Sequence, residues 1–398
     1  MSQLIFRALE RGATGLDLIR SRVLRFSLQN DLLRRIFSTR WMRLLTLFIF
    51  SCAFALATSC AAPLWVLLIG PFLYGVPHLF SSIRYFHRIA GTEAEDPRRH
   101  AIFKTIGAVF GTIFFYRLFV TIRFLGVDIP QLSEWKGSTY LELFGLISVF
   151  LLCGALYRRS LPGMLRGAII IAPFLSAFAL FPLWTIGALV LIHNFIAFVY
   201  WIAAAQSRAD RRVAIFSLLL TAFLTAAIFH GAFDPLTTWF PLTQALGFAS
   251  LTISDTGRMI APWSESELLW RHACIAFAFG QALHYFVWLK AIPDQLHYQE
   301  IPTSFRQSLQ LLRKDFGGRV TLFILAVILT SAAAFCFMSF QKARMVYFAL
   351  AAFHGYLEIA GLGLGAAKPE GFEAPLRHTG QPILSGANDM TAAQQMLS

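Results

Sequence analysis

The feature that most limits the fold of this chain is a series of apolar runs, each long enough to cross a lipid bilayer. A helical span needs about 17 to 25 mainly apolar residues, and hydrocarbon admits only helices or closed barrels because every backbone polar group must be paired. Of the 398 residues, 57% are hydrophobic and 14% are charged, whereas soluble domains carry about 25% charged residues. The sequence therefore predicts an all-α, polytopic transmembrane bundle of about ten helices. The expected spans lie near residues 44–61, 63–83, 101–121, 139–157, 164–181, 184–204, 213–232, 268–289, 319–340 and 344–365.

Composition divides the chain into three regions. Residues 1–43 contain nine arginines and no lysine, with apolar residues between them at roughly helical spacing. This pattern is typical of an amphipathic cytoplasmic segment that lies on the membrane surface and binds anionic lipid, although a solvated tail that only fixes orientation explains it equally well. Residues 44–365 form the predicted bundle, and residues 366–398 are a polar cytoplasmic tail.

The net charge of +13 is spread between the apolar runs rather than along one face. Nucleic acid is therefore a poor partner, and the positive-inside rule explains the charge better. With the N-terminus inside, the cytoplasmic loops collect most of the arginines, among them Arg84, Arg88, Arg158 and Arg159, so we expect both termini to be cytoplasmic. All five cysteines fall in apolar runs without CxxC spacing, which indicates neither a disulfide framework nor a thiolate metal site.

Four histidines fall inside expected spans: His78, His193, His284 and His354. Ionisable residues are expensive in the membrane interior and often mark functional sites. On the predicted topology all four spans run from outside to inside, with His193 and His354 near mid-membrane. At 1.5 Å per residue, His78 and His284 would lie roughly 8 Å closer to the cytoplasmic side than His193 and His354. This estimate is compatible with a single site of four histidines and with two separate pairs. A lone membrane histidine is usually a packing residue, but the recurrence favours a ligand set.

Neutral imidazole is a good ligand for iron, zinc or copper, so these four histidines are candidate metal ligands. Glu358 follows His354 by one helical turn and is the candidate catalytic carboxylate, either as an acceptor that orients His354 or as a direct ligand. The sequence HGAFD at 230–234 has the same form as HGYLE at 354–358. Because a histidine and an acid four residues apart share a helix face, His230 is a further candidate ligand.

The stretch Gly75-Val76-Pro77-His78 resembles the start of the motif Gly-x-Pro-His-Gly-x-x-Asp of the Brp/Blh family, bacterial membrane enzymes that cleave β-carotene to retinal. Leu79 replaces the second glycine of the motif, and Ser82 stands where the acid is expected. The resemblance implies a ferrous non-haem iron held by four histidines, with His78 as one ligand, and cleavage of a polyene by dioxygen. It implies a bacterial inner-membrane location.

These observations favour an integral-membrane oxygenase or oxidase that uses histidine-bound iron and dioxygen on an apolar lipid, isoprenoid or polyene substrate from the bilayer. Zinc or copper would fit the same ligands. One alternative is a haem b electron-transfer protein, because His272 and His284 lie twelve residues apart on one expected span. A second is a proton-coupled transporter in which buried histidines, Glu142, Glu358 and Arg117 form a relay.

Overall fold

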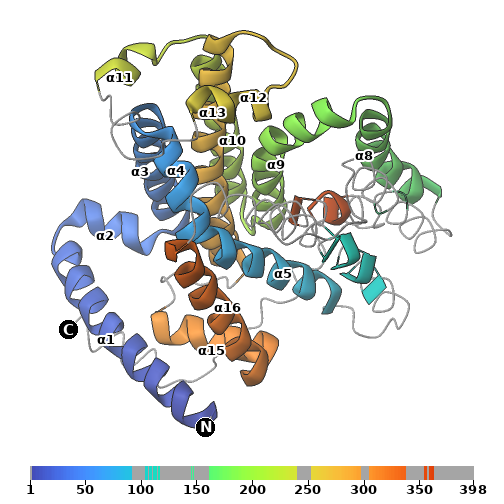
Figure 1. Cartoon of the computed structure of the whole chain (residues 1–398). Helices are drawn as coiled ribbons and strands as arrows, with labels where there is room; N and C mark the ends of the chain where they lie inside the picture. The colour runs from blue at the N-terminus through green and yellow to red at the C-terminus, as the bar shows by residue number, and fades with distance from the viewer. Residues whose placement is uncertain are drawn as a thin grey trace.

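A computed structural model of the whole chain describes residues 2–91, 161–239, 252–296 and 304–337, with further positions within 104–116, 145–147 and 354–362. These residues are helical apart from short turns and connections, and no strand occurs among them. The predicted all-α class is confirmed for the described part of the chain (Figure 1).

The described helices fall into three groups along the chain. The first group comprises α1 (Ser2–Leu28), α2 (Asp31–Ser38), α3 (Arg40–Ala61), α4 (Pro63–Gly70), the π-helical turn η1 (Pro71–Gly75) and α5 (Val76–Gly91). The second comprises α8 (Leu161–Leu180), α9 (Pro182–Ala204), α10 (Arg208–Phe229), α11 (Asp234–Trp239) and α12 (Ile253–Ile260). The third comprises α13 (Glu267–Phe286), the π-helical turn η3 (Val287–Ala291), α14 (Ile292–Leu296), α15 (Phe305–Phe316) and α16 (Gly318–Phe337).

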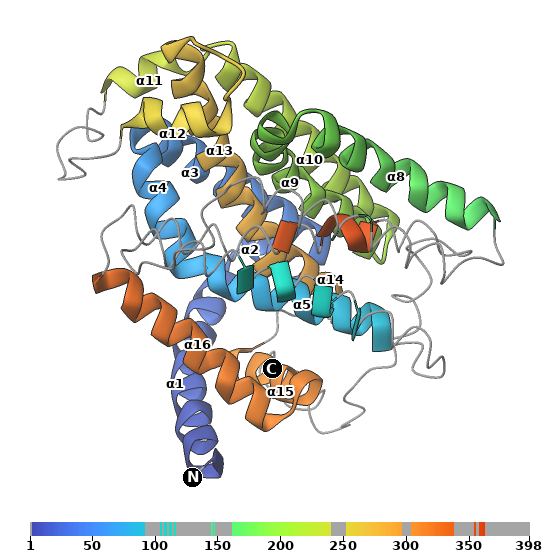
Figure 2. The same cartoon turned by 45° about the vertical axis from the view of Figure 1, so that its right-hand side comes forward.

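Helix α13 is the central element of the bundle. It packs against α3, α4, α9, α10 and α12 (Figures 1 and 2). Every residue from His272 to Tyr285 except Ala282 is buried, as expected of a helix that is covered on all sides. Polar side chains on this helix are therefore held in the interior, where they need partners.

Three helical stretches are long and apolar enough to cross a membrane: Arg40–Ala61, Arg208–Phe229 and Glu267–Gln295. A fourth exists if Pro63–Gly70 and Leu73–Tyr85, which meet at a bend of 44°, count as one span. Shorter apolar helices run over Leu191–Ala204 and Gly318–Ser331. The described residues thus contain three to four candidate spans rather than ten.

Two features explain part of the difference; the predicted spans 164–181, 184–204 and 319–340 are helical as α8, α9 and α16, but over the described residues these helices are not among the candidate spans. The predicted spans near 101–121, 139–157 and 344–365 lie largely outside the described residues. The predicted span 63–83 is divided, because the chain bends at η1 and α5 crosses the bundle instead of continuing α4 (Figure 2).

The outward faces of α3 and α10 are apolar. Phe50 and Phe54 on α3 and Leu219 and Phe223 on α10 are between 63% and 72% exposed. Large apolar side chains that face outward along a long helix suit contact with lipid. The structure is therefore consistent with a membrane protein.

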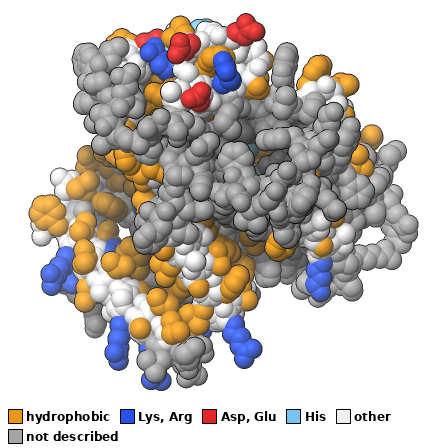
Figure 3. Space-filling view, in the orientation of Figure 1, with side chains coloured by type: hydrophobic (Ala, Val, Ile, Leu, Met, Phe, Trp, Pro, Cys, Tyr) orange, Lys and Arg blue, Asp and Glu red, His pale blue; other side chains and the backbone are white. Residues whose placement is uncertain are grey.

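The segment 1–43 is helical, as predicted, but it is not a separate unit. Helix α1 packs against α15, and the carboxylate of Asp17 accepts hydrogen bonds from the backbone of Phe305 (2.8 Å) and Arg306 (3.1 Å) at the start of that helix. Its other face is apolar and exposed at Leu18 and Phe26. Figure 3 shows apolar side chains over the region of α1, α15 and α16, with Lys and Arg at its rim.

Charged residues gather where α3 and α10 begin and where α13 gives way to η3 and α14. Arg40 pairs with Asp210, and Arg43 lies 3.7 Å from Asp294. Lys290 also pairs with Asp294, at 3.0 Å. We call this region the polar end of the bundle. Pairing offsets the cost of burying these charges and joins the ends of three long helices.

Candidate metal centre

Three histidines from distant parts of the sequence meet in the interior of the bundle. His78 belongs to α5, His284 to α13, and His354 to a helical stretch near the end of the described chain. Each is 1% exposed. One ring nitrogen from each lies within 4.8 Å of the others, and the ring centroids are 4.5 to 5.6 Å apart. Three buried imidazoles in this arrangement form a possible metal site.

His193 joins the same cluster from α9. Its ring centroid lies 4.8 Å from that of His284, and it is close enough to both His78 and His284 for electrostatic interaction. Its ring is only partly buried, and its nitrogens are not among the three that lie within 4.8 Å of one another. The four predicted histidines thus occupy one cluster, not two pairs.

Two π-helical turns shape the backbone around this cluster. The turn η1 ends three residues before His78, and η3 begins three residues after His284. At η3 the backbone N–H of Val287 is shared between the carbonyls of His284 and Leu283. Such turns are frequent at functional sites. The chain also bends by 44° at η1, and the rings of His78 and His354, for which straight helices predict a depth difference of roughly 8 Å, lie 4.5 Å apart.

Glu358 brings a carboxylate to the histidines. Its Oε1 lies 2.7 Å from Nε2 of His354 and 3.7 Å from Nε2 of His284, and these two nitrogens are 3.4 Å apart. Among the residues that the structure describes, neither oxygen of this fully buried carboxylate has an aligned hydrogen-bond partner. A buried charge without a partner is costly. Three buried ring nitrogens that lie close together beside this carboxylate form a possible metal site.

Ser82 determines the tautomer of His354. Its hydroxyl lies 2.8 Å from the carbonyl of Leu79 and 2.9 Å from Nδ1 of His354. A hydroxyl has one hydrogen, and a carbonyl can only accept, so Ser82 donates to Leu79 and accepts from the Nδ1–H of His354. The Nε2 lone pair of His354 is then free to bind a cation. Sequence reasoning noted Ser82 only as a departure from a motif.

Two amide side chains lie near the histidines, those of Gln281 and Asn194. The amide of Gln281 donates to the hydroxyl of Tyr285 (2.8 Å), whose ring lies 4.9 Å from that of His78. Asn194 is close to His284 through its backbone, and its side chain packs against Gly280, where an added Cβ would lie 3.1 Å from Nδ2.

An aromatic group that sequence reasoning missed supports the other side of the site. The hydroxyl of Tyr200 donates to the backbone carbonyl of Glu358 (2.6 Å), and the rings of Tyr85 and Trp288 lie 5.3 and 5.5 Å from that of Tyr200. Trp288 also lies 5.9 Å from the ring of His354. No sequence pattern marked these residues, because they come from three separate helices.

The structure does not bring His230 into the cluster. His230 is exposed at the end of α10, and the next residue, Gly231, lies beside His272. His272 is twelve residues before His284 on α13, which is about 18 Å along the helix. Asp234, the expected partner of His230, instead pairs with His272 at 2.9 Å.

Comparisons with protein-family models, with curated proteins and with solved structures gave no match for this chain.

Proposed function

We propose that this protein is an integral-membrane oxygenase or oxidase that binds iron through histidines and acts with dioxygen on an apolar substrate from the bilayer. The observation that carries the proposal is the meeting of His78, His284 and His354 in the interior, with the carboxylate of Glu358 beside them. The substrate class is a lipid, an isoprenoid or a polyene, in line with the resemblance of residues 75–78 to carotene-cleaving enzymes.

The donor set suits a non-haem ferrous ion. Imidazoles with one carboxylate are typical ligands of non-haem Fe(II) in oxygenases. The cysteines Cys52, Cys60 and Cys274 are buried, and none belongs to the histidine group. Bound iron would supply the binding and activation of dioxygen. Zinc and copper compete for the same ligands, so the identity of the metal is the first point to test.

The side chains around the histidines bury them and fix their positions. Ser82 keeps the proton of His354 on Nδ1. Glu358 supplies a negative charge 2.7 Å from Nε2 of His354, and Tyr200 fixes the backbone at Glu358. Tyr285 and Trp288 are 4% and 0% exposed, and their rings pack beside those of His78 and His354.

The proposed membrane placement follows the charge distribution. The polar end, with Arg40 and Arg43, lies on the cytoplasmic side by the positive-inside rule, and both termini are cytoplasmic in a bacterial inner membrane. Helices α1 and α2 lie on the anionic lipid surface. In the full chain we retain about ten spans, because α8, α9 and α16 coincide with predicted spans.

The haem alternative is weaker because of the spacing at His284. An axial ligand needs the width of a porphyrin in front of its nitrogen, but Nε2 of His284 lies 3.4 Å from Nε2 of His354. His272, the second haem candidate, is hydrogen-bonded to Asp234. The transporter alternative depends partly on Glu142 and Arg117, which lie outside the described residues.

The test is element analysis of detergent-purified protein, followed by oxygen uptake in liposomes that contain an apolar polyene. We expect about one iron per chain and uptake that depends on both the polyene and His284, with His272→Ala as the matched control. Protein without stoichiometric metal, or with zinc in place of iron, would contradict the proposal. Iron without polyene-dependent uptake would retain the metal site and refute the substrate class.

A further inference from the structure

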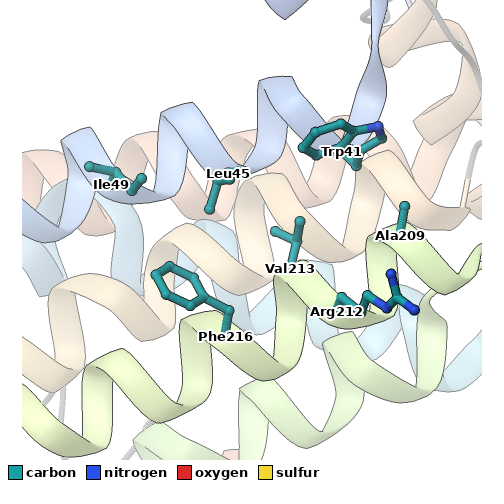
Figure 4. Close-up of a pocket in the computed structure, with 7 residues that line it drawn as sticks. All are labelled: Trp41, Leu45, Ile49, Ala209, Arg212, Val213 and Phe216. Atoms are coloured by element: carbon teal, nitrogen blue, oxygen red, sulfur yellow. The ribbon is translucent and has the colours of Figure 1, made fainter.

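A groove of about 390 Å³ lies between α3 and α10 near the polar end, apart from the histidine cluster (Figure 4). Its mouth lies at Trp41 and Arg212, and it runs past Val213 to Ile49 and Phe216. Trp41, Ile49 and Phe216 are 38%, 46% and 47% exposed, so the groove opens to the outside of the bundle. Its volume is in the range of small-molecule sites, about 300 to 1,000 Å³.

The groove is apolar along its length and positive at its mouth. Arg212 is exposed, and no carboxylate of the described residues forms an ion pair with it. The nearest acid in sequence, Asp210, is paired with Arg40 and accepts a hydrogen bond from Ser207.

The groove has the orientation of a lipid in one leaflet. Trp41 lies one residue inside the start of α3, and tryptophan is enriched at the membrane interface. From Trp41 to Ile49 the groove extends eight residues, or about 12 Å along the helix. This length fits within one leaflet of a hydrocarbon core about 30 Å thick. A ligand would have its charge at the interface and its apolar part inside.

We propose that this groove binds one anionic phospholipid, with its phosphate on Arg212 and one acyl chain along Val213 and Phe216. Charge complementarity identifies this occupant: a neutral apolar molecule would leave Arg212 without a partner. The inference rests on the proposed membrane placement, but it does not depend on the metal or the reaction. The bound lipid would bridge α3 and α10 beside the Arg40–Asp210 pair.

The experiment is native mass spectrometry of the full-length protein in detergent, with phosphatidylglycerol or phosphatidylcholine of the same acyl chains. We expect the native protein to retain phosphatidylglycerol roughly fivefold better, the effect of about one arginine at an anionic headgroup. Arg212→Gln should remove this preference. The control Arg208→Gln removes the same charge one turn earlier on α10, outside the groove lining, and should keep it.

A second pair of variants tests the apolar part. Ala209→Phe fills the groove near its mouth and should reduce retention of both lipids. Ala226→Phe places the same side chain on an exposed position of α10 outside the groove and should not. Equal retention of the two lipids by the native protein would overturn the proposal, as would equal loss in the Arg208 and Arg212 variants, which would indicate diffuse attraction.

Metal content measured on the same samples separates the two proposals. Iron without a lipid preference would refute only the lipid site. A lipid preference without iron would refute only the enzymatic proposal. Protein that stays in solution without detergent would refute the membrane placement on which both rest.

Discussion

The two segments of the form His-Gly-x-x-acid adopt different structures. In HGAFD (230–234) the glycine has a φ of +73°, α10 ends there, and the acid pairs with His272 of another helix. In HGYLE (354–358) the histidine and the acid are both helical, and their side chains are 2.7 Å apart. A spacing of four brings two side chains together only where the backbone between them stays helical.

The carboxylates of Asp234 and Glu358 also differ in their exposure and in their partners. Asp234 is 35% exposed and has a hydrogen bond to His272 and a nearby arginine, Arg271, at 3.6 Å. Glu358 is fully buried, faces two ring nitrogens and has no aligned hydrogen bond. The carboxylate of Asp234 therefore has its partners within the protein, in His272 and Arg271. The carboxylate of Glu358 is suited to bind a cation in the proposed site. Changes at Asp234 therefore serve as controls for the matched changes at Glu358.

The largest expected effect comes from removing a histidine of the inner group. His284→Ala deletes a proposed ligand, and even outer-shell changes cost about 10- to 100-fold in metal affinity, so we expect a loss of more than about 100-fold. His272→Ala, on the same helix, should leave the affinity unchanged. Chelator competition followed by element analysis gives both values. Equal metal content in the two variants would contradict a metal site at His78, His284 and His354.

Glu358→Gln keeps the shape of the side chain and removes its charge. We expect a loss of about 10- to 100-fold in metal affinity, because the buried carboxylate no longer balances the cation. Asp234→Asn is the matched change at the outer pair and should leave the metal in place, with at most about 1 kcal/mol lost from stability because the pair is partly exposed. If Glu358→Gln bound metal as tightly as the native protein, the carboxylate would have no role at the site.

Ser82→Ala should weaken metal binding by about tenfold, at the lower end for outer-shell partners, because His354 loses the acceptor that keeps its proton on Nδ1. Ser81→Ala is the control: its hydroxyl donates to the carbonyl of Trp288 (2.6 Å) and contacts none of the ligands. The variants are compared by metal titration and by thermal unfolding. If Ser82→Ala and Ser81→Ala lowered the unfolding temperature by similar amounts and left the metal affinity unchanged, Ser82 would have a packing role only.

The smallest effects concern the two glycines of the repeated form. Gly231→Ala forces a side chain into left-handed backbone, which costs about 1 to 2 kcal/mol, and its Cβ would lie 2.9 Å from Oδ2 of Asp234. At Gly355 no described atom lies within 4 Å of an added Cβ, so Gly355→Ala should be neutral or stabilising by up to about 1 kcal/mol. Thermal unfolding in detergent measures the difference. Equal destabilisation would mean that the backbone contrast between the segments is not real.

Sequence patterns predicted the helices and the identity of the inner cluster. Apolar runs predicted α3, α10 and α13, and the cost of a histidine in an apolar span was enough to select His78, His193, His284 and His354. These inferences succeeded because they depend on composition within one segment.

The missed features depend on long-range contacts or on local backbone breaks. Ser82 bonds to a histidine 272 residues away, which no local pattern contains. The bend at η1 comes just before His78, whose ring lies 4.5 Å from that of His354, a residue that straight-helix arithmetic placed at another depth. His230 was grouped with Asp234 because its glycine was assumed to be helical, whereas Gly231 has a positive φ.

The order of turn and ligand differs between the two helices that hold His78 and His284. In α5 the π-helical turn comes before the histidine, whereas in α13 it comes after. Each helical residue rotates the chain by about 100°. Deleting one residue from η1 would therefore swing the ring of His78 away from its neighbours, whereas a deletion in η3 after Trp288 would leave His284 in place and rotate the residues that follow, including α14. The two deletion variants would differ in metal content, because the orientation of His78 depends on the π-helical turn before it, whereas the orientation of His284 does not depend on the turn after it.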